Sequence, residues 1–162
     1  MTKQEFKDFC HEEFIRQGFK KRKSVYYLHG KDLLCGLYLQ KSMSDAYYVE
    51  YNFFLGNFPD IKKYPAIYDA DINMRFTVLS KDTYEGEYFM DACIEYELYT
   101  EEELKKYFDE EFEKHVMPII KEGKERLIQD LDYFFDEMFE EEIQKVLNKL
   151  GIDREHQWYW RQ

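Results

Sequence analysis

The chain has 162 residues and a formal net charge of −11, because 34 Asp and Glu outnumber 23 Lys and Arg. Its hydrophobic share of 44% and aromatic share of 19% are too high for a disordered acidic chain, so we expect one folded domain over residues 1–162. An acidic surface repels phosphate groups, and no apolar run approaches the roughly 20 residues of a membrane helix, so neither nucleic acid nor a membrane is predicted as a partner.

The first 17 residues predict an amphipathic helix. Thr2, followed three residues later by Glu5, has the pattern of a capping box, and Gly18 is suited to end the helix. Apolar side chains recur between them at spacings of three and four and so share one face; they are Phe6, Phe9, Cys10 and Phe14.

Residues 24–98 predict an antiparallel sheet of about five strands. From Tyr88 to Leu98 an apolar side chain stands at every second position, which is typical of a strand with one buried side. A loop with a short helical turn is expected over 56–70, and the only basic patch, 20–23, precedes the sheet. The predicted strands are rich in Tyr, Val, Leu and Ile and are separated by turn-forming residues. They are expected over 24–29, 33–40, 46–55, 72–79 and 88–98.

Residues 101–150 predict two to three helices. Thr100 with Glu103 repeats the capping-box pattern, Pro118 suits a helix start and Gly151 a helix end. Residues 151–162 form an aromatic tail, which we expect to pack back on the body; the alternative is an exposed contact site. A helix, an antiparallel sheet and further helices in this order indicate the α+β fold class. The helices are expected over 101–114, 118–135 and 139–150.

The sequence nominates no catalytic residue, no metal and no cofactor. Its four His are scattered, without the close pairs that zinc sites use, and with 7 Gly it has no phosphate-binding glycine motif. The three Cys are an odd number and far apart in the chain, which favours reduced thiols in the cytoplasm over a disulfide framework.

Two acidic stretches are the most specific signal for function. Residues 101–113 carry many acids against only Lys105 and Lys106, and residues 132–142 carry six acids and no base. One interpretation is a solvated helix face that keeps the protein soluble. The other is a docking surface for a basic protein, with aromatic anchors beside the acids. The residues proposed for it are Tyr107, Asp109, Glu110, Tyr133, Asp136 and Glu137.

A second group of polar residues stands near predicted strand ends. These side chains can converge on an anionic group, which the guanidinium of Arg75 would bind through two hydrogen bonds. The alternative interpretation is turn chemistry with one satisfied ion pair. The group consists of Gln40, Lys41, Ser42, Asn52 and Arg75.

Several short motifs follow one another in a familiar order. They are Gly18-Phe19-Lys20-Lys21, Tyr26-Tyr27, Leu39-Gln40-Lys41-Ser42, an aromatic strand through Asn52 to Leu55-Gly56, and Arg75 on a later strand. In this order they resemble the bacterial family catalogued as domain of unknown function 4304, over about the first 80 residues. The resemblance implies a helix, a sheet, a helical C-terminal part and a bacterial origin, and it implies no activity.

We therefore expect a small cytoplasmic protein without catalysis that binds another protein. Its most concrete form is an immunity-type protein that neutralises a basic toxin or nuclease. The alternative is a small anionic-ligand-binding protein or an enzyme, with its site on the sheet near Gln40 and Arg75. A structural role in a larger assembly is a third interpretation. The sequence leaves the partner and the oligomeric state open.

Overall fold

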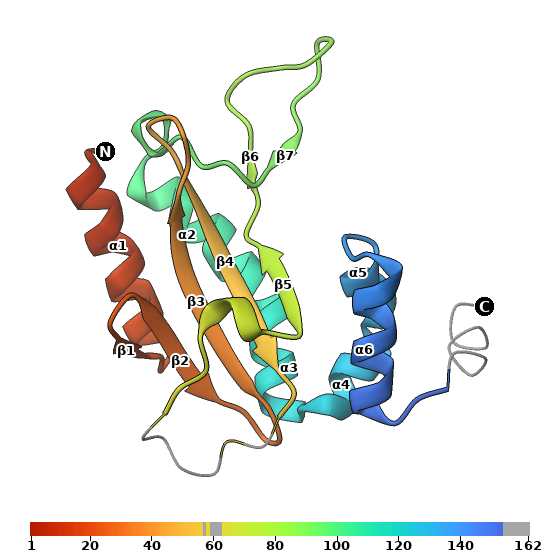
Figure 1. The fold of residues 1–162 in the computed structure, drawn as a ribbon. Helices are drawn as coiled ribbons and strands as arrows, with labels where there is room; N and C mark the ends of the chain where they lie inside the picture. Colours follow the sequence, from red (N-terminus) through yellow and green to blue (C-terminus); the bar gives the residue numbers. More distant parts are fainter. Residues whose placement is uncertain (57, 59–62, 154–162) are drawn as a thin grey trace.

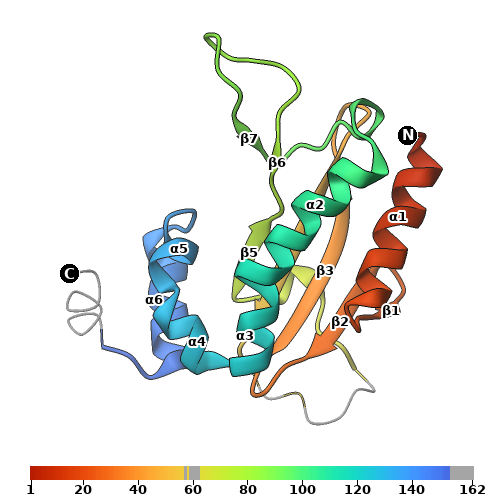
Figure 2. The ribbon, with the colours of Figure 1, turned by 180° about the vertical axis from the view of Figure 1, so that it is seen from behind.

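A computed structural model describes residues 1–56, 58 and 63–153. A five-stranded antiparallel sheet has its strands in chain order, each pairing with the next (Figure 1). The strands are β1 (Lys20–Arg22), β2 (Val25–His29), β3 (Leu34–Lys41), β4 (Tyr47–Phe54) and β5 (Ile72–Arg75). One face is covered by α1 (Lys3–Arg16), α2 (Glu101–Glu111) and α3 (Met117–Glu122) (Figure 2). Beyond the edge strand β5 stand α4 (Lys124–Gln129), α5 (Leu131–Phe135) and α6 (Glu140–Leu150). The α+β fold class is confirmed.

The N-terminal helix forms as the sequence predicts. α1 begins after Thr2, whose hydroxyl accepts a hydrogen bond from the Glu5 N–H at 3.1 Å, while the Glu5 carboxylate accepts one from the Thr2 N–H at 3.3 Å. After the helix, Gly18 has a φ of +99°, a left-handed conformation that favours glycine. The predicted apolar face, which includes Phe6 and Phe14, is buried.

One buried cluster joins the main sheet to all six α-helices. Phe76, which directly follows β5, has its ring centroid 5.2 Å from that of Phe108 and 5.1 Å from that of Phe112, in edge-to-face geometry. Phe53 of β4 meets Phe134 of α5 in the same way at 5.7 Å. Edge-to-face pairs are a favoured arrangement of aromatic rings, and here they hold α2 and α5 against the sheet.

The opposite face of the sheet is covered in part by the segment that follows β4. This segment contains a 3-10 helix, η1 (Ile67–Asp69), which confirms the short helical turn expected within 56–70. Tyr27 donates a hydrogen bond to the Pro65 carbonyl at 2.5 Å. A second, smaller cluster of buried side chains lies under the segment and consists of Val25, Tyr27, Leu34 and Phe54.

The sheet starts earlier than predicted. Residues 20–22 form β1, where the sequence analysis found only a basic patch. All three residues are exposed and charged, so they lack the apolar alternation that predicts a strand. Pairing with β2, and not the composition of the strand, makes this segment extended.

The strand predicted over 72–79 is two strands. β5 ends at Arg75, and β6 (Val78–Leu79) pairs with β7 (Met90–Asp91) in a separate two-stranded sheet. Phe76 is buried, and the N–H of Thr77 donates a hydrogen bond to the Glu111 carboxylate at 3.0 Å. The chain therefore leaves the main sheet after Phe76.

The strand predicted over 88–98 is wrong for most of its length. Only β7 is a strand; Ile94 makes an isolated bridge, and η2 (Tyr96–Leu98) is a 3-10 helix. Ile94 is buried as expected, whereas Tyr88 is exposed. A tight turn at Glu85 and Gly86 pairs the start of this segment with the residues just before it, and such local pairing closes a short loop at low entropic cost.

The helix predicted over 118–135 is three short helices. α3 ends at Glu122, because the next residue, Gly123, has a φ of +74° and a ψ of −151°, outside the helical region. Asp130 separates α4 from α5. The Asp32 carboxylate caps α4 by accepting a hydrogen bond from the Lys124 N–H at 2.8 Å. A Cβ atom at Gly123 would stand 2.2 Å from an Asp32 oxygen, so the break requires glycine.

The two remaining helix predictions hold with one change. The helix predicted over 101–114 is α2, which ends at Glu111 and continues as a π-helical turn, η3 (Phe112–Val116). The helix predicted over 139–150 is confirmed as α6, and Gly151 ends it with a φ of +70°. The tail prediction lies outside the described residues, which stop at Asp153. Within the described part of the chain, no helix has the length and apolar character needed to cross a membrane.

Candidate functional site

Residues 80–89 connect β6 to β7 as a hairpin that projects beyond the sheet and the helices (Figures 1 and 2). We call these residues the hairpin arm. At its tip, Glu85 and Gly86 have φ values of +51° and +81°. Tyr84 and Glu87 exchange backbone hydrogen bonds of 2.8 and 3.0 Å across this turn. Two central residues with positive φ match the right-handed twist of a hairpin, so the arm is a defined turn structure.

The base of the arm is anchored by hydrogen bonds. The hydroxyl of Ser80 accepts one from the Phe89 N–H at 3.0 Å and donates one to the Asp82 carbonyl at 2.7 Å. Tyr99 donates a hydrogen bond to the Leu79 carbonyl at 2.7 Å. The bonds of Ser80 close the base of the arm, and the bond from Tyr99 ties β6 to the body.

The arm carries aromatic rings into solvent. Tyr84 is 72% exposed, Tyr88 is 62% exposed and Phe89 is 42% exposed. Large apolar side chains that gather in one exposed place mark interaction sites, whereas single exposed ones need no explanation. The grouping of three rings within six residues therefore makes the arm the first candidate for a binding site.

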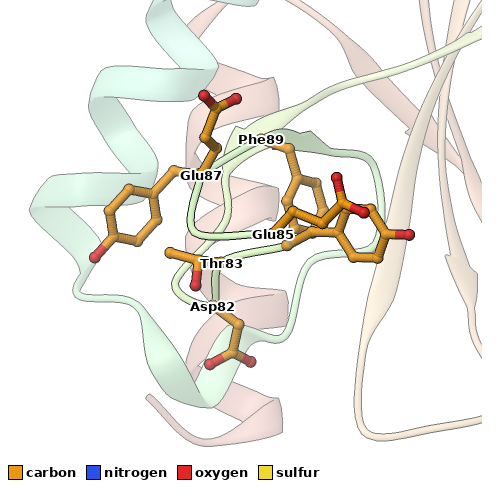
Figure 3. Close-up of a pocket in the computed structure, with 7 residues that line it drawn as sticks. Asp82, Thr83, Glu85, Glu87 and Phe89 are labelled. Atoms are coloured by element: carbon orange, nitrogen blue, oxygen red, sulfur yellow. The ribbon is translucent and has the colours of Figure 1, made fainter.

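The arm is also acidic. It carries Asp82, Glu85 and Glu87, and Figure 3 shows their carboxylates pointing to different sides of the loop. Its one base, Lys81, forms an ion pair with Glu103 at the start of α2, and this contact lowers the pKa of the Glu103 carboxyl. With Lys81 paired, the charge that the arm presents to a partner is negative.

A second hollow, which we call the edge cleft, lies between β5 and the end of α5 and has a volume of about 600 Å³. Met90 of β7 lines it, so the cleft adjoins the base of the arm. Its charged lining residues are Glu50, Arg75, Asp136 and Glu137. Acidic groups outnumber basic ones here as they do on the arm.

A buried carboxylate lies behind the cleft, linked to it by Thr77. Glu111, only 6% exposed, has one oxygen that accepts hydrogen bonds from the N–H and the hydroxyl of Thr77, at 3.0 and 2.9 Å. Its other oxygen is buried without a hydrogen-bond partner among the described residues. Burial raises the pKa of Glu111, and the bonds from Thr77 oppose that rise. An unpaired buried oxygen costs stability, and it lies beside a π-helical turn, a distortion frequent at functional sites.

Two of the five residues predicted to bind an anion lie together on the face of the sheet opposite α1, α2 and α3. Arg75 donates a hydrogen bond to the Gln40 side chain at 3.2 Å and lies 3.7 Å from a carboxylate oxygen of Glu50. Its guanidinium also covers the ring of Tyr48, 3.9 Å from the ring centroid. Burial raises the pKa of Glu50, and Arg75 opposes that rise. Three neighbours thus engage this guanidinium.

The other three predicted residues lie elsewhere. Lys41 follows Gln40 along β3, so it points to the opposite face and lines a groove beside α1. The hydroxyl of Ser42 accepts a hydrogen bond from the Ser44 N–H at 3.1 Å within the turn after β3. Asn52 is fully buried, and its side-chain nitrogen lies 3.5 Å from a backbone oxygen of β3. Of the five, the structure brings Gln40 and Arg75 into contact.

The predicted partner surface divides into two parts, and its C-terminal part lies in the edge cleft. Tyr133, Asp136 and Glu137 all line the cleft. The Tyr133 ring stacks on His115 with 4.0 Å between the centroids, and burial lowers the pKa of this His115. This part of the prediction coincides with a hollow that adjoins the arm.

The part predicted on α2 is engaged within the molecule. Asp109 forms ion pairs with Arg16 at 2.9 Å and with Lys105 at 3.1 Å, which tie α1 to α2. Tyr107 is partly buried against the core, and Glu110 is partly exposed. A hollow at the arm, lined by residues 82–85 and 87–89, is called the arm hollow. Tyr107, Asp109 and Glu110 line neither the arm hollow nor the edge cleft.

The sequence analysis placed a turn over 81–86 between the strands expected over 72–79 and 88–98, but it did not predict that this turn projects as an arm. Its signal was the Glu85-Gly86 pair between two short aromatic stretches, a combination typical of hairpin turns. The regular alternation from Tyr88 onward suggested a core strand instead. Periodicity alone does not show which strand a segment pairs with, and here that pairing decides whether the rings are buried.

The described residues contain no group of three or more His, Cys, Asp or Glu side chains placed to hold a metal ion. The three cysteines are free, with Cys10 and Cys35 buried and Cys93 partly exposed. Burial raises the pKa of both buried thiols, which keeps them protonated and poorly nucleophilic.

Fold and site together define an α+β domain with an acidic, aromatic arm. The model of one family, DUF4304, a domain of unknown function, matches residues 10–122, and the chain belongs to this family. The match runs from α1 to the end of α3 and includes the arm, so it extends past the first 80 residues on which the resemblance rested. No curated protein and no solved structure matches the chain.

Proposed function

We propose that this protein is a non-catalytic interaction module that binds a basic protein through the hairpin arm and the acidic end of the edge cleft. In its most concrete form it is an immunity-like protein of the bacterial cytoplasm that neutralises a basic toxin or nuclease. Its free cysteines support a reducing compartment, where disulfides are rare.

The observation that carries the proposal is the exposure of Tyr84, Tyr88 and Phe89 on an anchored hairpin. Each ring that a complex removes from water contributes about 25 cal/mol per Å² of apolar area. Because Ser80 and Tyr99 already order the base of the arm, binding loses little conformational entropy. Tyrosines in such positions are among the side chains that carry most of the binding energy of interfaces.

Charge supports a basic partner over a neutral or acidic one. The carboxylates of Glu85 and Glu87 lie on the arm, and those of Asp136 and Glu137 line the adjoining cleft. Together with the net charge of −11, they attract a positively charged surface and speed its association.

The first experiment replaces Tyr84 by a photo-crosslinking residue in cells of the natural host. Tyr68 on η1 is 84% exposed and lies outside the arm, so the same replacement at Tyr68 is a matched control. We expect position 84 to capture a basic protein that position 68 does not capture.

The captured protein is then purified and titrated with the double variant Y84A/Y88A and with Y68A. Both arm tyrosines are exposed, so the double variant is expected to fold. We expect it to bind about 100-fold more weakly than the wild type, while Y68A stays within about twofold. An acidic captured protein, equal capture from both positions, or unchanged affinity of Y84A/Y88A would each contradict the proposal.

A further inference from the structure

A groove of about 710 Å³ lies between α1 and strands β1 to β4. It shares no lining residue with the arm hollow or the edge cleft. We call it the lysine groove, because Lys3, Lys7, Lys21 and Lys41 line it. In a chain with a net charge of −11, four lysines around one hollow are a marked departure from the composition.

Helix geometry places the first part of this cluster. Lys3, Lys7 and His11 follow one another at spacings of four on α1, so they stand in one row on its surface. The Nδ1 atom of His11 lies 2.7 Å from the hydroxyl of Tyr26 on β2. This contact holds the row beside the strands that form the other wall.

Strand register places the second part. Lys21 of β1 pairs with Tyr26, and Lys41 of β3 pairs with Tyr47. The ammonium of Lys21 lies 5.7 Å from the centroid of the Tyr26 ring, and that of Lys7 lies 5.9 Å from the centroid of the Tyr47 ring. Both tyrosines are buried and the lysines are exposed, so rings form the floor of the groove and ammonium groups its rim.

Of the basic side chains that the structure describes, some form ion pairs with carboxylates, and the groove lysines are among those that do not. Arg16, Lys105 and Arg126 all form ion pairs, whereas none of the four groove lysines forms one within the described part of the chain. The one carboxylate that lines the groove, Asp8, accepts a hydrogen bond from Gln4 at 2.9 Å. Like charges in one hollow repel each other, and a bound anion would offset that cost.

We propose that the lysine groove binds a small phosphorylated molecule with several negative charges. Four ammonium groups from α1, β1 and β3 suit a ligand whose charge is spread over more than one phosphate group, since each lysine acts as a separate point charge. The groove also contains Lys3 and Gln4 of the first turn of α1, where the helix dipole favours anions.

Size and surroundings favour a small ligand over a long one. The volume of the groove lies within the roughly 300–1,000 Å³ of small-molecule sites. A nucleic acid would extend past the groove onto a surface whose net charge repels it. The site is independent of the proposed binding of a basic protein, because the two share no lining residue.

Isothermal titration calorimetry of the full chain with inorganic pyrophosphate, ATP and adenosine tests this site. We expect pyrophosphate and ATP to bind with dissociation constants below about 1 mM and adenosine not to bind. Tighter binding of ATP than of pyrophosphate assigns the groove to nucleotides, and the reverse order to phosphate compounds without a base. Both orders support the proposal, because the phosphate groups are the shared chemistry.

The double variant K7Q/K21Q removes two charges from the rim, and K106Q/K145Q removes two from exposed positions on α2 and α6. We expect the first to weaken pyrophosphate binding at least about tenfold and the second to change it less than about twofold. Circular dichroism checks that both variants fold, and a loss of wild-type affinity with added NaCl gives a second measure of the charge contribution.

Three results would overturn the proposal. The first is no pyrophosphate or ATP binding at concentrations up to about 1 mM. The second is an equal loss of affinity in both double variants, which would mean that only the overall charge matters. The third is an acidic peptide such as octaglutamate binding more tightly than pyrophosphate and ATP, which would assign the groove to a protein partner.

Discussion

The arm with its edge cleft and the lysine groove are hollowed regions of opposite charge on one chain. The arm carries three carboxylates and one base that is already paired, whereas four unpaired lysines and one carboxylate line the groove. The net charge of −11 agrees in sign with the arm and the edge cleft, and not with the groove. The net charge of the whole chain predicts one class of partner. The positions of the charged side chains indicate two classes, a basic protein at the arm and a small anionic molecule at the groove.

The two regions also differ in how they are built. Hydrogen bonds from Ser80 and Tyr99 hold the base of the arm, and its rings are exposed. The groove has rigid walls, from α1 and the sheet, and long flexible lysines on its rim. We therefore expect the arm to bind through aromatic contacts and the groove through charge, with salt weakening binding at the groove more.

The largest expected effect comes from Gly123→Ala. This variant should destabilise α4–α6 beside the edge cleft and leave the lysine groove unchanged. The new Cβ would meet the Asp32 carboxylate, and the backbone at Gly123 adopts a conformation open only to glycine, so we expect a loss of about 3 kcal/mol in the free energy of unfolding. Chemical denaturation measures this loss, and hydrogen exchange should locate it in α4–α6.

Gly151→Ala is the matched control, because Gly151 also has a positive φ but has no atom within 4 Å of the added Cβ. It should cost about 1 kcal/mol. Equal losses in the two variants would show that the contact with Asp32 does not matter, and faster exchange in α1 would show that the two regions are not separable.

The next effect comes from Ser80→Ala, which removes two hydrogen bonds at the base of the arm. We expect a loss of about 1–2 kcal/mol and faster exchange of the Phe89 amide, with the groove unaffected. Ser44→Ala in the exposed turn after β3 is the control. Unchanged protection of the Phe89 amide would mean that the arm is held by other contacts.

A smaller effect is expected from Glu111→Gln behind the edge cleft, and it depends on pH. Burial raises the pKa of Glu111 in the folded state above its usual 4.5. Below pH 4.5 the buried carboxyl is protonated, which is the form that the folded protein favours. As the pH rises through the folded-state pKa, the carboxyl ionises and this contribution to the stability of the folded protein is lost. Glutamine keeps the oxygen that Thr77 contacts and removes the charge. We expect a gain of about 1 kcal/mol near pH 7 and no gain near pH 4.

Thermal unfolding across this pH range measures the difference between Glu111→Gln and the wild type. Thr77→Val is the companion variant, since it removes the hydroxyl that donates to Glu111. It should destabilise the protein more near pH 7 than near pH 4. A gain from Glu111→Gln that does not change with pH would contradict the assignment of this carboxylate.

The smallest effect concerns the groove without ligand. Because K7Q/K21Q relieves repulsion among lysines, we expect its Tm to rise by about 1 °C at low salt and the rise to vanish at high salt. K106Q/K145Q should show no rise, since Lys145 lies 3.9 Å from the carboxylate of Glu141 and that attraction is lost. A lower Tm for K7Q/K21Q would mean that the lysines stabilise the free protein.

Sequence reasoning succeeded where structure is decided locally. The capping box of α1, the turn of η1 and the end of α6 at Gly151 depend on residues within a few positions of each other. It failed where a distant partner decides. The break at Gly123 depends on Asp32, whose carboxylate caps Lys124 across 92 positions of the chain.

The candidate sites follow the same division. Tyr133, Asp136 and Glu137 were predicted from a run of acids, and they do line a hollow, but the arm beside it depends on which strand residues 88–91 pair with. Asn52 is polar in sequence and fully buried in the fold. Lys41 was predicted beside Gln40, and strand alternation separates the two onto opposite faces.

The separation of the two charged regions can be measured directly by two-dimensional NMR of the ¹⁵N-labelled full chain, titrated once with inorganic pyrophosphate and once with hexa-arginine. We predict two sets of shifted amides without overlap. Pyrophosphate should shift those around Lys7, Lys21 and Lys41, and hexa-arginine those around Glu85, Glu87 and Asp136. Overlapping sets, or shifts on the arm with pyrophosphate, would contradict the existence of two distinct binding regions.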